Sequence, residues 1–130
     1  MSKDLLFDVY SKAKNKNVLD DELINFINSI FPNKVNKVLD TIKRGVTKYS
    51  YKPSNRVIWV ALGKDSEHLI YPRLYCSCQD FYKNVVIQRN RGFCKHLVAQ
   101  AICEGLNDFN VLELEDEDFH KLVEDLNLKF

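Results

Sequence analysis

The sequence predicts a single α+β domain in which amino-terminal helices precede a three-stranded antiparallel meander, a cysteine-rich segment and further helices. Three observations support this prediction. Apolar residues recur at helical spacing in residues 1–45, the period changes to two in residues 46–75, and two tight pairs of cysteine and histidine follow. The chain has 130 residues, which suffices for one modest core.

Two helices are expected before residue 32. In the first, residues 4–14 place their apolar side chains on one face; these are Leu5, Leu6, Val9, Tyr10 and Ala13. The second begins after Asp20, whose carboxylate is a good N-cap. It stops at Pro32, because proline has no N–H with which to continue the helical hydrogen bonds.

A third helix is expected from Val35, with Asn33 as its cap. Gly45 is placed to end it in the left-handed conformation that glycine adopts readily. Its exposed face is basic and carries Lys34, Lys37, Lys43 and Arg44.

The meander is expected in residues 46–75. The stretch VTKYSY alternates, RVIWVAL is apolar on both faces and so reads as the central strand, and HLIYPRLY is the third strand. Pro72 cannot donate to a neighbouring strand, so the third strand is an edge or bends at that point. The meander delivers the chain directly to Cys76.

Three more helices are expected beyond the meander. A short one, capped by Asp80, spans residues 79–88, and a longer apolar one runs from Lys95 to Leu106. An acidic helix starts at Glu115, because acidic residues suit a helix N-terminus. The chain thus divides into a helical segment (residues 1–45), the meander with the cysteine-rich finger (46–106) and the acidic helix (107–130), all within one domain.

Three of the four cysteines and one of the three histidines form two pairs, Cys-x-Cys at Cys76 and Cys78 and Cys-x-His at Cys94 and His96. Residues two apart in a strand point the same way, so the first pair can face one ion. Residues two apart in a helix diverge, so Cys94 must precede the helix and His96 must lie in its first turn. Three sulfurs and one nitrogen are typical of one structural zinc, and four protein ligands leave no position open for catalysis.

Three residues of ligand type fall outside these pairs. Cys103 lies seven residues beyond His96, roughly 10.5 Å along the helix, which is too far to share the ion. We expect it to be a buried apolar residue. His68 and His120 have no ligand spacing and are expected to be structural or exposed.

Charge is unevenly distributed although the net charge is only +1. Residues 34–95 hold thirteen basic and four acidic side chains, whereas residues 96–130 hold two basic and nine acidic ones. The basic middle indicates an anionic partner such as nucleic acid, or else the two halves neutralise each other in the fold. No apolar run approaches the ~20 residues that cross a bilayer, and the first residues lack a signal-peptide pattern, so a cytoplasmic location is expected, or a nuclear one in a eukaryote.

The two ligand pairs resemble the SWIM-type zinc finger, whose pattern is Cys-x-Cys, a variable spacer and Cys-x-His. The stretches CQDFYKNVV and CKHLVAQAI are similar to the branch of SWIM proteins found in Shu complexes, and Ala99 matches an alanine of that branch. Many SWIM fingers carry proline next to the first pair, where this chain has Ser77 and Gln79. The resemblance covers residues 68–106 well and the rest by layout.

The resemblance implies a non-enzymatic adaptor in homologous recombination and DNA repair. Such proteins pair with a RecA/RadA-like recombinase paralogue and assist recombinase on single-stranded DNA. The chain has no phosphate-binding Gly-rich loop of its own, which fits a subunit that does not hydrolyse ATP.

The alternative is a freestanding DNA-binding zinc finger module that acts in transcription or other DNA transactions. Basic residues surround the ligand pairs, and the candidate DNA contacts are Arg73, Lys83, Arg89, Arg91 and Lys95. Aromatic residues beside them offer stacking surfaces for bases, or they pack around the zinc; these are Tyr75, Phe81, Tyr82 and Phe93. An enzymatic role is not expected, since the acidic residues beside His68 and His120 have no third member in sight.

Overall fold

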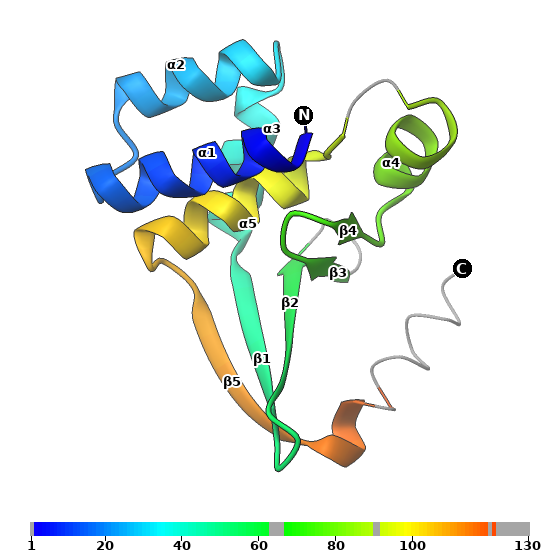
Figure 1. Ribbon diagram of the computed structural model, residues 1–130. Helices are drawn as coiled ribbons and strands as arrows, with labels where there is room; N and C mark the ends of the chain where they lie inside the picture. Colours follow the sequence, from blue (N-terminus) through cyan, green and yellow to red (C-terminus); the bar gives the residue numbers. More distant parts are fainter. Residues whose placement is uncertain (1, 63–66, 90–91, 120, 122–130) are drawn as a thin grey trace.

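The computed structural model describes residues 2–62, 67–89, 92–119 and 121. The three amino-terminal helices and the helix that begins at Lys95 gather at one end of a twisted sheet whose longer strands extend beyond them, and the short helical segment at residues 116–119 lies at the other end (Figure 1). This arrangement confirms the predicted α+β class. Among the helices of these residues, none has the length and apolar character needed to cross a membrane.

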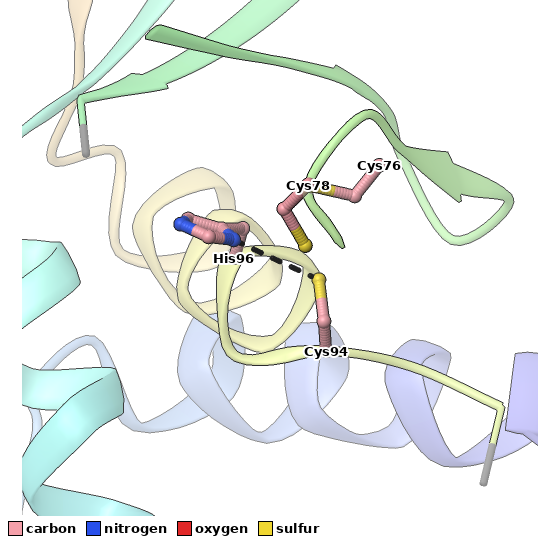
Figure 2. A group of neighbouring side chains, drawn as sticks. All are labelled: Cys76, Cys78, Cys94 and His96. Carbon is pink, nitrogen blue, oxygen red and sulfur yellow. Dashed lines mark hydrogen bonds between the residues drawn. The ribbon is translucent and has the colours of Figure 1, made fainter. Parts of the chain in front are cut away.

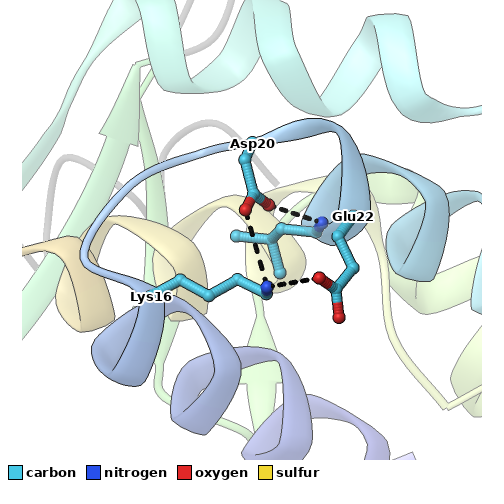
Figure 3. A network of polar contacts seen from close by, with 4 residues as sticks. Lys16, Asp20 and Glu22 are labelled. Carbon is cyan, nitrogen blue, oxygen red and sulfur yellow. Dashed lines mark hydrogen bonds and ion pairs between the residues drawn. The ribbon is translucent and has the colours of Figure 1, made fainter.

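The amino-terminal helices are α1 (Ser2–Lys16), α2 (Asp21–Ile30) and α3 (Val35–Arg44). Asp20 caps α2 as predicted, because its Oδ1 accepts a hydrogen bond of 2.9 Å from the Leu23 N–H. Its other carboxylate oxygen lies 3.5 Å from the Lys16 ammonium, which also reaches Glu22 at 2.8 Å (Figure 3). This partly exposed network joins the end of α1 to the start of α2.

The ends of α3 differ from the prediction. Lys34, not Asn33, is the N-cap, and its side chain makes no capping hydrogen bond. Asn33 instead adopts a positive φ of 64° in the turn before the helix. Gly45 has the predicted positive φ, 108°, but its ψ of 148° lies outside the left-handed helical region.

Within the described residues, the sheet has five strands in the order β4-β3-β2-β1-β5 rather than three. The predicted meander is present as β1 (Val46–Lys52), β2 (Arg56–Leu62) and β3 (Glu67–Tyr71), all antiparallel. The predicted third strand is divided by a turn at Pro72, where a bend was expected, and its second part is β4 (Tyr75–Cys76). One strand was not foreseen: β5 (Asn110–Glu115), which pairs with β1 in parallel.

The predicted helix over residues 79–88 is a short α4 (Gln79–Phe81) that continues as a π-helix, η1 (Tyr82–Ile87). Its cap is Cys78 rather than Asp80, since the Cys78 Sγ accepts from the Phe81 N–H at 3.3 Å. The apolar helix is α5 (Lys95–Leu106), as predicted.

The acidic helix begins one residue later than predicted, after the end of β5. Residues 116–119 are helical, as is residue 121, and the remainder of the predicted helix lies outside the described residues.

The helix α5 lies at the centre of the fold. It contacts α1, α3 and the strands β1 to β4, and nine of its twelve residues are buried. Successive side chains of each strand point to opposite faces of the sheet, and each face carries its own apolar cluster. Trp59 and Ile70 pack on the helical side, whereas Ile58 and Tyr51 belong to a smaller cluster with Phe119 on the other face. The central position of α5 matters because the predicted zinc ligands lie at its amino-terminal end.

Candidate metal centre

The four predicted ligands converge from separate elements of the chain. Cys76 ends β4, and Cys78 follows two residues later as the cap of α4. Cys94 is the residue before α5, with extended backbone angles, and His96 lies in the first turn of that helix. The positions of Cys94 and His96 relative to the helix are as predicted. Figure 2 shows the four side chains pointing toward one another.

The geometry fits a tetrahedral zinc ion. The ligand atoms of the four residues all lie within 4.8 Å of one another, and each residue is buried. A tetrahedron with a Zn–S bond of ~2.3 Å and a Zn–N bond of ~2.0 Å separates the sulfur from the nitrogen by about 3.5 Å. The Cys94 Sγ and the His96 Nδ1 are already 3.8 Å apart, so Nδ1 is the ring nitrogen that faces the sulfurs. The cluster is therefore consistent with one structural zinc.

Three buried thiols beside one another cannot all ionise without a compensating positive charge. Hydrogen bonds with the Cys78 and Cys94 thiols, together with burial, raise the pKa of Cys76 far above its usual range. Burial chiefly raises the pKa of Cys94 as well. Hydrogen bonds from the Cys76 and Cys94 thiols instead lower the pKa of Cys78. A divalent cation is the charge that would hold all three as thiolates, because a coordinated thiol is deprotonated.

Ser77, between the first two ligands, fixes their loop to the sheet. Its Oγ accepts a hydrogen bond of 2.9 Å from the Leu69 N–H, and its own N–H donates to the Leu69 carbonyl at 3.0 Å. The residue that departs from the SWIM pattern thus extends the pairing of β3 past Cys76. The sequence identified this departure but gave no sign of its partner on β3.

His68 is a second contributor that spacing did not identify. It lies on β3, and its ring centroid is 4.5 Å from that of His96. The contact packs the ligand ring against β3. His68 is therefore structural, as expected, but it supports the metal centre directly. His120 lies outside the described residues.

Several other residues near the finger that the sequence singled out are buried in the core. Cys103 is buried, with 1% of its surface exposed, and burial raises its pKa to about 12. It is therefore the inert apolar thiol that the sequence predicts. Ala99 is fully buried in the main core, on the same helix as His96. Phe81 and Phe93 are also buried there, consistent with packing.

An open hollow of about 580 Å³ adjoins the metal ligands. Its walls include Tyr75, Tyr82 and Val86, and Lys83 also lines it. Tyr75 is 40% exposed and Tyr82 is 59% exposed, so both rings are accessible from solvent. We call this feature the finger hollow.

The five candidate DNA contacts differ in how accessible they are. Lys83 and Arg89 are exposed, and Lys95 is half-buried. The Arg73 guanidinium lies 3.4 Å from Glu104 and over the Tyr10 ring at 5.2 Å, which gives it a structural role between the sheet and the helices. Arg91 lies outside the described residues, so the structure does not place the fifth candidate.

Curated proteins similar to this chain carry one name. The zinc finger SWIM domain-containing protein 7 homologue of Dictyostelium discoideum is 26% identical over 123 residues, which span 92% of this chain and 78% of that protein. The mouse protein 7 (Mus musculus) is 25% identical over 93% of this chain and 81% of its own length. The human protein of the same name (Homo sapiens) is 24% identical over 88% of this chain and 84% of its own length. No protein-family model and no solved structure matches the chain.

Proposed function

We propose that this chain is a SWIM-type zinc finger protein of the Shu-complex branch and acts as a non-enzymatic adaptor in homologous recombination and DNA repair; its similarity to proteins named for the SWIM zinc finger and its buried Cys/His cluster support the proposal. It pairs with a RecA/RadA-like recombinase paralogue and assists recombinase on single-stranded DNA. The buried Cys76–Cys78–Cys94–His96 cluster carries the proposal, because it is the feature that defines the resemblance.

The structure of the centre supports an adaptor rather than an enzyme. Its four ligands come from the protein, so a tetrahedral zinc held there has no open position for a water or a substrate. Such a zinc fixes the shape of a surface. We place the protein in the cytoplasm, or in the nucleus of a eukaryotic cell.

Co-expression with a tagged recombinase paralogue from the same organism tests this function. We expect a stable complex that survives size-exclusion chromatography. The complex should be lost in Cys94→Ser, which removes a zinc ligand, and retained in Cys103→Ser, which removes a buried thiol outside the cluster. Failure of the zinc-loaded wild-type protein to bind any paralogue of this class would reject the adaptor role.

A second candidate function is direct binding of single-stranded DNA, and the finger hollow favours it. Two exposed tyrosine rings, Tyr75 and Tyr82, stand beside the exposed Lys83 ammonium. Aromatic rings next to cationic side chains are a general arrangement for single-stranded nucleic acid, because bases stack and phosphates pair with the charges. The same residues would bind single-stranded DNA when this protein is part of a complex with the paralogue.

Binding of a fluorescent oligothymidine at several salt concentrations checks this second function. Tyr82→Ala should weaken binding by about tenfold, as loss of one stacked base costs ~1–3 kcal/mol. Lys83→Ala should reduce the salt slope by about 0.7, the value for one phosphate contact on a single strand. Lys43→Ala, an exposed lysine on α3, is the matched control and should change neither. Equal binding of the oligonucleotide by all three variants would exclude the finger hollow as the DNA-binding site.

A further inference from the structure

The strand β5 forms an open edge of the sheet. In the described part of the chain it pairs with β1 alone, and Figure 1 shows no described element along its outer side. The opposite edge is protected, because β4 is only two residues long and follows Pro72. The Leu69 N–H of β3, which would otherwise be open at this edge, donates to the Ser77 hydroxyl. Natural sheets usually protect edges in this way, because an unprotected strand accepts another strand.

Backbone groups on β5 are available for pairing. The Glu115 N–H donates to the Asp118 carboxylate at 3.1 Å and not to β1. Backbone groups alternate in direction along a strand. The N–H and C=O groups of Val111 and Glu113 therefore face away from β1, and no described strand pairs with them.

The side chains of β5 differ between the two faces of the sheet. Leu112 and Leu114 align with Tyr49 and Tyr51 of β1, on the face of the smaller apolar cluster. Leu114 is packed in that cluster, but Leu112 is 46% exposed. By alternation, Val111, Glu113 and Glu115 lie on the other face, where Val111 is 63% exposed.

The end of β5 is strongly acidic. Residues 113–118 contain five acidic side chains and no basic one. The described ion pairs involve none of them. A second copy of this chain complements the edge less well than a basic segment, because its own β5 would add acidic side chains to an edge that is already acidic. Opposed like charges destabilise a strand pair.

We propose that the open edge of β5 docks an extended segment of a partner protein in which basic and apolar residues alternate. The segment adds a sixth strand by pairing with Val111 and Glu113. Its basic side chains then lie beside Glu113 and Glu115, and its apolar ones lie beside Leu112. This is strand addition, in which main-chain hydrogen bonds give affinity and alternate side chains give specificity. The site is separate from the zinc ligands and the finger hollow, so it can fail while the recombination role stands.

A synthetic peptide of sequence KLKVKLK, with both ends blocked, is the probe. Its partner is the full-length zinc-loaded protein, and a peptide of the same composition without alternation, KKLVLKK, is the control. We expect the alternating peptide to bind at least tenfold more tightly than the control in fluorescence anisotropy. Hydrogen exchange at the Val111 and Glu113 amides should slow when it binds.

Two substitutions at one position separate charge from backbone pairing. Glu113→Gln removes the charge alone. Glu113→Pro also removes an N–H that faces the open side, which proline tolerates on an edge strand because the bonds to β1 remain. We expect an affinity loss of a few-fold for Glu113→Gln and of more than tenfold for Glu113→Pro, with unchanged melting temperatures.

Three results would overturn the proposal. One is no binding of the alternating peptide to the wild-type protein, and another is equal binding of the two peptides, which would reflect charge attraction alone. The third is a dimer of this protein that Glu113→Pro dissociates, since that would make a second copy the occupant of the edge.

Discussion

Cys94 and Cys103 are both buried thiols near the ends of α5, yet their surroundings give them different tasks. Cys94 faces two other sulfurs and the His96 ring, whereas Cys103 packs in the apolar core. We predict that Cys94→Ser is largely insoluble and that its soluble fraction holds well under one equivalent of zinc. Cys103→Ser should keep one equivalent and lose about 1–3 kcal/mol of stability, the cost of burying a hydroxyl without a partner. Elemental analysis and denaturant unfolding measure the two effects.

The comparison isolates coordination from packing, because both substitutions replace a buried sulfur by the same hydroxyl. Equal zinc content in the two variants would contradict the assignment of Cys94 as a ligand.

Tyr51 is a fully buried residue of the smaller cluster, and its hydroxyl has no hydrogen-bond partner among the described residues. Burial chiefly raises its pKa to about 12, with help from the nearby charges of Tyr49, Asp118 and Glu67. The folded state therefore favours the neutral phenol. The resulting stability is complete below pH ~10, the pKa of an unfolded tyrosine, and is lost as the pH rises toward 12.

Tyr51→Phe should therefore flatten the alkaline loss of stability between pH 10 and 12. At pH 7 it should raise the free energy of unfolding by about 1 kcal/mol, because an unpaired buried hydroxyl is removed. Urea unfolding at the two pH values measures both changes. A variant that is less stable than wild type at pH 7 would show that the hydroxyl has a partner in solution.

The elements differ in how far local sequence determines them. Helices α2 and α5 were predictable because a cap or an apolar stripe marks each one. Strand β5 was missed since its sequence, NVLELE, reads as the approach to an acidic helix, and its pairing with β1 is set by tertiary contacts. The helix over residues 79–88 was predicted, but the π-helical form of η1 was not, and no residue of η1 is buried.

The packing of α1 on α5 depends on one residue that sequence patterns did not single out. At Gly105, an added Cβ would lie 2.6 Å from the Tyr10 carbonyl oxygen and 2.7 Å from the Ala13 Cβ. Gly105→Ala should therefore destabilise the protein by about 1–3 kcal/mol, the usual cost of overpacking a core. Helix propensity alone predicts the opposite sign, a gain of up to about 1 kcal/mol.

The exposed Asn25→Ala on α2 is the control, since it changes propensity without a contact. It should be neutral or slightly stabilising in the same unfolding experiment. If Gly105→Ala also proves stabilising, the two helices are less closely packed than described.

For the molecule as a whole, the four zinc ligands could be predicted from the sequence, but the residues that hold those ligands in place could not. Spacing identifies Cys76, Cys78, Cys94 and His96, because residues two apart converge in a strand and diverge in a helix. The hydrogen bonds of Ser77 to Leu69 and the ring of His68 depend on how β3 lies against the finger. The accessibility of Arg73 likewise depends on the neighbouring Tyr10 and Glu104, which no local pattern reveals.

The central place of α5 makes the stability of the whole domain depend on zinc. The ion would join the β4–α4 segment to the first turn of α5, which in turn packs on α1, α3 and the sheet. Structural zinc sites contribute ~10 kcal/mol or more, which rivals the net stability of a small domain. We therefore predict that a strong chelator unfolds residues 68–106 and that the helices packed on α5 lose protection with them. Circular dichroism and hydrogen exchange before and after chelation follow both changes, and returning zinc should reverse them. An unchanged melting temperature after complete zinc removal would show that apolar packing alone holds α5 in place.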